Sequence, residues 1–244
     1  MEMAKAFDIH VVPCRFRQDN RSYYIDHDKN AISDALTSVK QISGRVAEAL
    51  YEMRDKQYQT FVDLLYEMEM HPAFDTRNVE ILIRMGYFQE FGSTGKLLAI
   101  QHAFYNSDTR FSKALIPKSQ QKRLDGLRAF EVTVPESEIP MKEQLAFEVQ
   151  FFGTPLTTYP EAKGVYAVLE IDDRYSPKVR LYKVATGSVG IMKILKKTFQ
   201  KEPLTAGSLI TIQHWDNRPA YRYVAGERIK TERTELWLRQ YRAL

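Results

Sequence analysis

Residues Leu36-Thr37-Ser38-Val39-Lys40-Gln41-Ile42-Ser43-Gly44-Arg45-Val46-Ala47 decide how the first half of this chain is interpreted. Apolar residues with helical spacing lie on both sides of a short polar turn that ends in Gly44. They are Ile32, Leu36 and Val39 on one side, and Val46, Ala49, Leu50 and Met53 on the other. The pattern predicts two short helices and a tight turn, the layout of a helix-hairpin-helix. A plain helical hairpin is the alternative.

Such a turn is suited to holding a phosphate group. Backbone N–H groups at the start of the second helix can point at the anion, and flanking cations add charge without reading a base sequence. The usual hairpin has two glycines around an apolar residue, whereas here Gln41 and Ser43 flank Ile42. The candidate DNA-contacting residues of the turn are Lys40, Gln41, Ile42, Ser43, Gly44 and Arg45.

Composition bounds the class of protein. The chain has 244 residues, a net charge of +4 and 44% hydrophobic residues, which is typical of a globular protein with a mildly basic surface. It has one cysteine, Cys14, so no intramolecular disulfide can form, and we expect that residue to be packed in the core. With no long apolar run and no signal-type leader, the expected location is the cytoplasm. The five histidines are scattered, so we expect no metal and no cofactor.

Further helices are predicted as far as residue 152. Phe61, Leu64, Leu65 and Met68 form one apolar face, and a fourth helix begins after the N-cap Asp75 and ends at a left-handed Gly86. We assign Arg77 and Arg84 of this fourth helix to the DNA-contacting set. Other helices are expected over 93–104 and 141–152. The polar, basic stretch between 106 and 140 is interpreted as mixed helix and loop, and it carries Lys113, Lys118, Lys122, Arg123 and Arg128.

The pattern becomes strand-like after Pro160. Short β-rich segments are predicted at 165–171, 179–184, 189–195, 209–214, 220–224 and 236–241, with a turn at Asp216-Asn217-Arg218-Pro219. We therefore predict an α+β fold, with a helical region over 1–160 and a small OB-like barrel over 161–244. Aromatic and basic residues alternate in the second part, as in single-strand binders. The residues assigned here are Arg180, Tyr182, Lys183 and Arg222. A barrel core with a solvated basic face is the alternative.

The order of these motifs resembles the bacterial DNA polymerase III alpha subunit, from the end of its fingers region onward. A strand-proline element matches Ile9-His10-Val11-Val12-Pro13, and a short β-hairpin matches Tyr23-Tyr24-Ile25. The hairpin motif then matches at Val39-Lys40 and Val46-Ala47, followed by Arg54 and a Phe-rich helix from Thr60 to Leu65. Next come a helix leading into Met85-Gly86-Tyr87-Phe88 and a helix running into Gly153-Thr154-Pro155-Leu156. The resemblance covers residues 5–160 well and the barrel region loosely.

The resemblance implies DNA binding without sequence preference, with duplex at the hairpin and single strand at the barrel. It implies no catalysis by this chain, because the metal-binding aspartates of the family belong to a palm that lies upstream of the residues matched here. Asp172-Asp173 is the only acidic pair in the β part, and it is interpreted as a solvated turn. The alternative function is a non-catalytic protein-interaction module that docks replisome partners. Loss of the hairpin glycines favours that alternative, whereas the basic and aromatic alternation favours DNA.

Overall fold

The chain forms two compact units. The computed structural model describes residues 10–224 and 227–244, and the units divide between Ile139 and Pro140. The predicted boundary lay near residue 160. It falls earlier because α7 (Met141–Phe152) packs on the barrel, with Leu145 and Val149 buried against the strands. The two units are described separately below.

The first unit begins with a small sheet. Its strands β1 (His10–Val11), β2 (Tyr24–Asp26) and β3 (Ala31–Ser33) lie in the order β1-β3-β2. The predicted helix through Ile32, Leu36 and Val39 is therefore wrong. Ile32 lies in β3 opposite Ile25, and only Leu36–Ser38 form a single 3-10 turn, η1. Pairing with β2 satisfies the backbone of residues 31–33, so the helical spacing of these apolar residues does not produce a helix.

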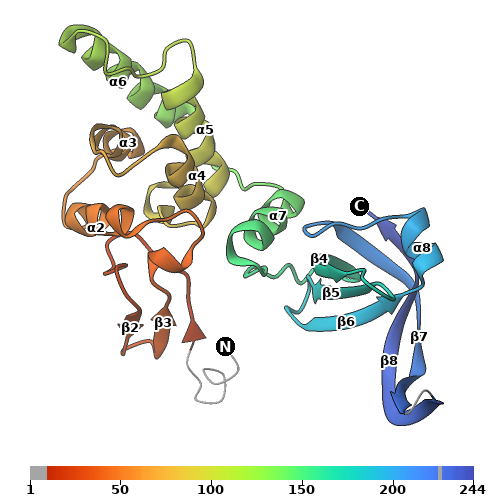
Figure 1. Cartoon of the computed structure of the whole chain (residues 1–244). Helices are drawn as coiled ribbons and strands as arrows, with labels where there is room; N and C mark the ends of the chain where they lie inside the picture. The colour runs from red at the N-terminus through yellow and green to blue at the C-terminus, as the bar shows by residue number, and fades with distance from the viewer. Residues whose placement is uncertain (1–9, 225–226) are drawn as a thin grey trace. The chain divides into compact units, whose positions relative to one another are not determined.

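Five helices and a second 3-10 turn follow in the first unit, and Figure 1 shows their arrangement. The structure confirms Asp75 as the N-cap of α4, where it accepts from the Asn78 backbone N–H at 2.8 Å. It also confirms Gly86 in the left-handed region, with φ of +72°. Thr60 and Asp63 form a second capping box at α3. The elements are α2 (Gly44–Met53), α3 (Phe61–Met70), α4 (Thr76–Arg84), η2 (Gln89–Phe91), α5 (Thr94–Asn106) and α6 (Pro117–Thr133).

A buried carboxylate joins α6 to α3. Glu131 accepts hydrogen bonds from the backbone N–H groups of Phe61 at 2.8 Å and Val62 at 3.0 Å. These groups lie in the first turn of α3, where no carbonyl of the same helix is available to them. A negative charge is also favoured at a helix N-terminus. The stretch 106–140, predicted as mixed helix and loop, therefore contains the long helix α6, whose C-terminal half is anchored to α3.

The second unit is a closed five-stranded barrel with the strand order β4-β5-β6-β8-β7. The β6–β8 pair is parallel and the other pairs are antiparallel. This order and pairing are those of an OB fold, which confirms the predicted α+β class and the OB-like barrel. A short helix between β6 and β7 was not predicted. The elements are β4 (Val165–Asp172), β5 (Lys178–Lys183), β6 (Val189–Ile194), α8 (Lys196–Lys201), β7 (Leu209–Val224) and β8 (Glu227–Ala243).

The last two strands are much longer than predicted. Residues 209–214 and 220–224 belong to one strand, β7, so the predicted turn at Asp216–Pro219 is wrong. Asp216 pairs with Trp237 and Pro219 with Thr234, and register shifts on both sides of this segment accommodate the pairing. Figure 1 shows β7 and β8 running on together past the other strands of the barrel as a two-stranded arm. Within the described ranges, no helix is long and apolar enough to cross a membrane.

Candidate nucleic-acid interface

The predicted hairpin turn connects η1 to α2. Val39 and Ile42 are buried at 4% and 5% exposure, and the Ile42 N–H donates to the Val39 carbonyl at 3.1 Å. Gln41 lies between them with φ of +70°, in the left-handed region. This is the first of the two positions where the usual hairpin has glycine. The backbone therefore keeps the glycine conformation at residue 41 although the side chain is glutamine.

The N-terminus of α2 is open. Ser43 is its N-cap, and its hydroxyl accepts from the Val46 N–H at 3.5 Å. The N–H groups of Gly44 and Arg45, the first two residues of α2, have no acceptor within the helix. Gly44 lies outside the left-handed region, and a Cβ added there would meet no atom within 4 Å. Neither backbone conformation nor internal packing therefore requires glycine at residue 44.

Exposed cations flank this helix start. Lys40 precedes it and Arg45 is its second residue, and both side chains are exposed. Arg77 and Arg84 lie on α4 rather than on the turn. Arg77 is exposed, whereas Arg84 is only 18% exposed and its Nε lies 2.8 Å from Oε1 of Glu80. This low exposure and the ion pair with Glu80 make Arg84 a poorer candidate for a DNA contact than Arg77.

A buried polar network supports the hairpin, and it was not predicted from the sequence. Asn20 is fully buried and donates from Nδ2 to the carbonyl of Ala47 in α2 at 3.0 Å. Its own carbonyl accepts from the Leu36 N–H at 3.0 Å. Asn20 therefore connects η1 to α2 across the turn. No local signal distinguishes this asparagine from a surface one, because its partners come from distant parts of the chain.

The barrel presents a second basic surface on β5. Lys178 and Arg180 are exposed, with Lys193 and Ile191 of β6 as their partners in register. Within the described part of the chain, neither Lys178 nor Arg180 makes an ion pair. Lys183 is partly exposed at the end of β5. The outer face of the second and third strands is where OB folds bind oligonucleotides.

One of the predicted barrel contacts, Tyr182, needs revision. Tyr182 is only 4% exposed, because α7 covers its side of β5, and its hydroxyl donates to the carbonyl of Thr157 at 2.9 Å. Burial raises the pKa of Tyr182. It is a core residue and cannot stack on a base. Arg222 lies in β7, but its side chain is outside the described residues.

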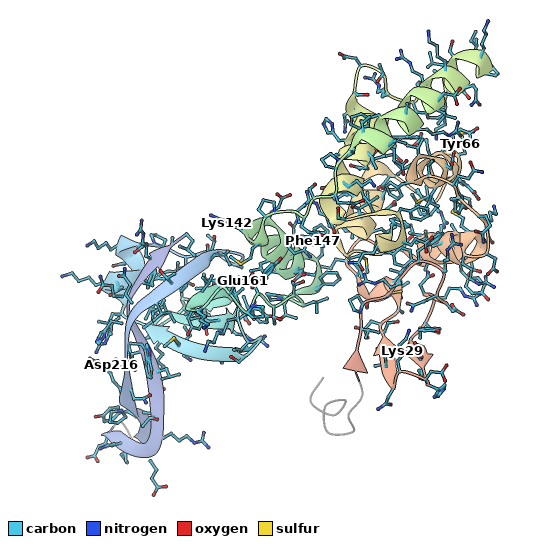
Figure 2. All side chains as sticks on the ribbon, turned by 180° about the vertical axis from the view of Figure 1, so that it is seen from behind. Lys29, Tyr66, Lys142, Phe147, Glu161 and Asp216 are labelled. Carbon is cyan, nitrogen blue, oxygen red and sulfur yellow. The ribbon has the colours of Figure 1, made fainter. Side chains whose placement is uncertain are left out.

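Several other barrel cations are paired with carboxylates. Lys193 Nζ lies 2.6 Å from Oε1 of Glu235, and Arg239 Nη2 lies 2.8 Å from Oδ2 of Asp216, which Figure 2 labels on β7. Arg174 Nε donates a hydrogen bond to Oδ1 of Asp172 at 2.9 Å, and this bond lowers the pKa of the Asp172 carboxyl. Among the described side chains, no group of three or more His, Cys, Asp or Glu is placed to hold a metal ion. Exposed aromatic rings remain at Tyr175, Trp215 and Tyr221.

The comparisons with known proteins agree with the first unit. Residues 8–98 match the family model of the helix-hairpin-helix motif. No curated protein matches the chain. The matched segment contains β1 to β3, the hairpin turn and the helices α2 to α4. The motif supports DNA binding without sequence preference, and an OB-like barrel follows it in the chain.

Proposed function

We propose that this chain is the DNA-binding C-terminal portion of a replicative polymerase of the bacterial DNA polymerase III alpha type. In this role the hairpin binds the backbone of duplex DNA, and the barrel binds single-stranded DNA. The order of the sequence motifs supports this assignment, as do the helix-hairpin-helix match and the OB-like barrel that follows it. Nucleotidyl transfer then belongs to a palm on other residues than these.

The open start of α2 carries the proposal. Two backbone N–H groups without an acceptor in the helix lie at the positive end of the helix dipole, and two exposed cations flank this helix start in the sequence. Gly44 leaves space for an oxygen atom to approach the backbone closely, and nothing inside the protein demands that space. A phosphate oxygen fits each of these properties. None of these groups reads a base edge, so binding is independent of base sequence.

Duplex binding by the intact chain tests the proposal. Phosphate contacts release counterions, so the logarithm of the affinity falls linearly with the logarithm of salt concentration, with a slope of about 0.9 per contact. Replacing Lys40→Ala and Arg45→Ala together should weaken binding of every duplex sequence and lower that slope by about 1.8. The control is Lys196→Ala with Lys197→Ala on α8, which removes the same charge from two exposed positions.

The outcomes of this titration are distinct. Loss confined to the Lys40 and Arg45 variant supports the hairpin as the duplex site. Equal losses of duplex affinity in both variants would show that binding depends on net charge alone. No duplex binding by the unchanged protein at low salt overturns the proposed function.

A second candidate function is docking of a replisome protein on the barrel. Val189 is 46% exposed and Ile191 is 62% exposed on β6, and Lys193 of the same strand is paired with Glu235. An apolar, charge-balanced strand suits a protein better than a polyanion. Replacing Val189→Ser and Ile191→Ser separates the two functions. Unchanged single-strand binding with lost replisome-protein binding would assign this face to docking.

A further inference from the structure

The longest helix of the first unit carries a groove that the proposed hairpin site does not include. The groove has a volume of about 540 Å³ and is lined by Thr109, Leu115, Ser119, Lys122, Arg123 and Gly126. Four of these residues come from α6 at positions i, i+3, i+4 and i+7, so they share one face of the helix. We propose that this groove holds a stretch of nucleic-acid phosphodiester backbone. The inference rests on the proposed DNA-binding function and extends it to a second contact.

Charge favours an anion in this groove. Six basic residues lie between residues 106 and 140, and two are already engaged: Lys113 with Glu69 at 2.9 Å and Arg128 with Asp63 at 2.7 Å. Lys122 and Arg123 make no ion pair with any described residue. The lining of the groove contains no carboxylate. The nearby Asp125 is held by Arg128 Nη1 at 2.9 Å and by Gln121 Nε2 at 2.8 Å.

The walls of the groove are fixed by hydrogen bonds. Gln120 Nε2 donates to the carbonyls of Leu115 at 2.8 Å and Lys113 at 3.1 Å, which ties the preceding loop to α6. In the loop that carries Thr109, the Phe111 N–H donates to the carbonyl of Phe104 at 3.0 Å. The Ser107 hydroxyl bonds to the Ala103 carbonyl at 2.6 Å and lies 3.3 Å from the Thr109 hydroxyl oxygen. The Thr109 hydroxyl and the loop that precedes α6 are thus held in place before any ligand arrives.

The length of the groove selects a chain of phosphates over a single ion. At a rise of 1.5 Å per residue, Ser119 and Gly126 are about 10 Å apart along the helix axis. That distance exceeds the size of one phosphate group. Gly126 faces open space, since a Cβ added there would meet no atom within 4 Å. A glycine in the middle of a helix lowers its stability, so its presence here is consistent with close approach of a ligand to the backbone.

A pair of matched variants of the full chain tests this groove. Lys122→Ala with Arg123→Ala removes two lining cations. Arg110→Ala with Lys118→Ala removes two exposed cations nearby that do not line the groove. Both changes alter the net charge equally. Titrating labelled duplex over a range of salt should show the slope fall by about 1.8 in the first variant and by less than about half of that in the second.

Each result decides something. The proposed groove contact would be contradicted if both double variants lowered the salt slope equally. It would also be contradicted if the Lys122 and Arg123 variant bound duplex normally while circular dichroism showed an intact fold. If the Lys122 and Arg123 variant lost binding to phosphatidylserine vesicles but bound duplex as before, the groove would be assigned to a lipid head group instead of nucleic acid. If the unchanged protein binds duplex and the Lys40 and Arg45 variant weakens it, the proposed function survives even when the groove fails. If the unchanged protein does not bind duplex, both fail together.

Discussion

The hydroxyl of Tyr87 donates a hydrogen bond to Oδ1 of Asn20 at 2.9 Å, and both side chains are buried. Tyr87 follows α4, while Asn20 precedes the small β2–β3 hairpin, so the bond joins distant segments. Asn20 in turn holds Ala47 of α2. Burial raises the pKa of Tyr87, which keeps the phenol protonated and able to donate. The hairpin turn is thereby tied to the rest of the first unit through one buried asparagine.

Replacing Tyr87→Phe should destabilise the protein by about 1–3 kcal/mol, because it leaves the buried Oδ1 of Asn20 without this donor. Urea unfolding followed by circular dichroism measures the change. Tyr23→Phe is the control, since that ring is 66% exposed and its loss of a hydroxyl should cost little. Equal stability of the two variants would show that the buried bond contributes nothing.

Replacing Gln41→Gly should stabilise the protein by up to about 1 kcal/mol, because the left-handed conformation at φ of +70° is costly for glutamine and not for glycine. Gln59→Gly, also an exposed loop glutamine, serves as the control, because among the described residues it is not one of those with positive φ. Thermal unfolding of both variants checks this. A gain in stability in both variants, or in neither, would contradict the strain at residue 41.

Ser43, the second position where the usual hairpin has glycine, has an extended backbone and is the N-cap of α2. Replacing Ser43→Ala should therefore lower the free energy of unfolding by about 1 kcal/mol.

Replacing Gly44→Ala should separate stability from binding. The added methyl group meets no protein atom, so the free energy of unfolding should stay the same or rise by up to about 1 kcal/mol. Duplex affinity should fall, because the methyl group obstructs the oxygen that approaches the helix start. Chemical unfolding and a duplex titration on the same protein preparation measure the two effects. Unchanged affinity in a stable variant would mean that no phosphate approaches Gly44.

Glu136 gives the first unit a predictable response to acid. Hydrogen bonds from Lys96 and Ser93 lower its pKa from 4.5 to about 2. A carboxyl with a lowered pKa in the folded state contributes stability above its unfolded pKa, and that contribution is lost as the pH falls toward the folded pKa. Replacing Glu136→Gln should therefore destabilise the protein near neutral pH, and the difference should shrink between pH 4.5 and about 2. A difference that is constant over this range in urea unfolding would contradict the assignment, and Glu138→Gln is the control.

Much of the helical structure in both units follows from local rules. The burial of Phe61, Leu64, Leu65 and Met68 matches their helical spacing, and α7 has the bounds that its amphipathic pattern predicts. The N-cap Asp75 and the left-handed Gly86 were predicted because each acts through its own backbone neighbours. Figure 2 shows Tyr66 on α3, where its ring meets Phe111 edge-on at 5.3 Å. That contact joins segments far apart in sequence and could not be predicted.

The candidate site divides in the same way. The sequence located the turn from Lys40 to Arg45, because glycine and the change of spacing mark it locally. It did not reveal Asn20 or the groove on α6, because both depend on partners from other elements. It also misplaced Tyr182 among the exposed rings. Leu181 faces the barrel core, while α7 covers the opposite face of β5 and buries Tyr182 as well.

The sequence by itself determined the class of fold, the order of a helical part followed by a β part, and the position of the polar hairpin turn. These features depend on spacing, capping and turn residues within a few positions of each other. Only the tertiary structure decided that Ile32 lies in a strand, that residues 216–219 continue β7, and that the barrel closes through the parallel β6–β8 pair. Strand pairing joins residues that are distant in the chain, and register and burial exist only once both partners are in place.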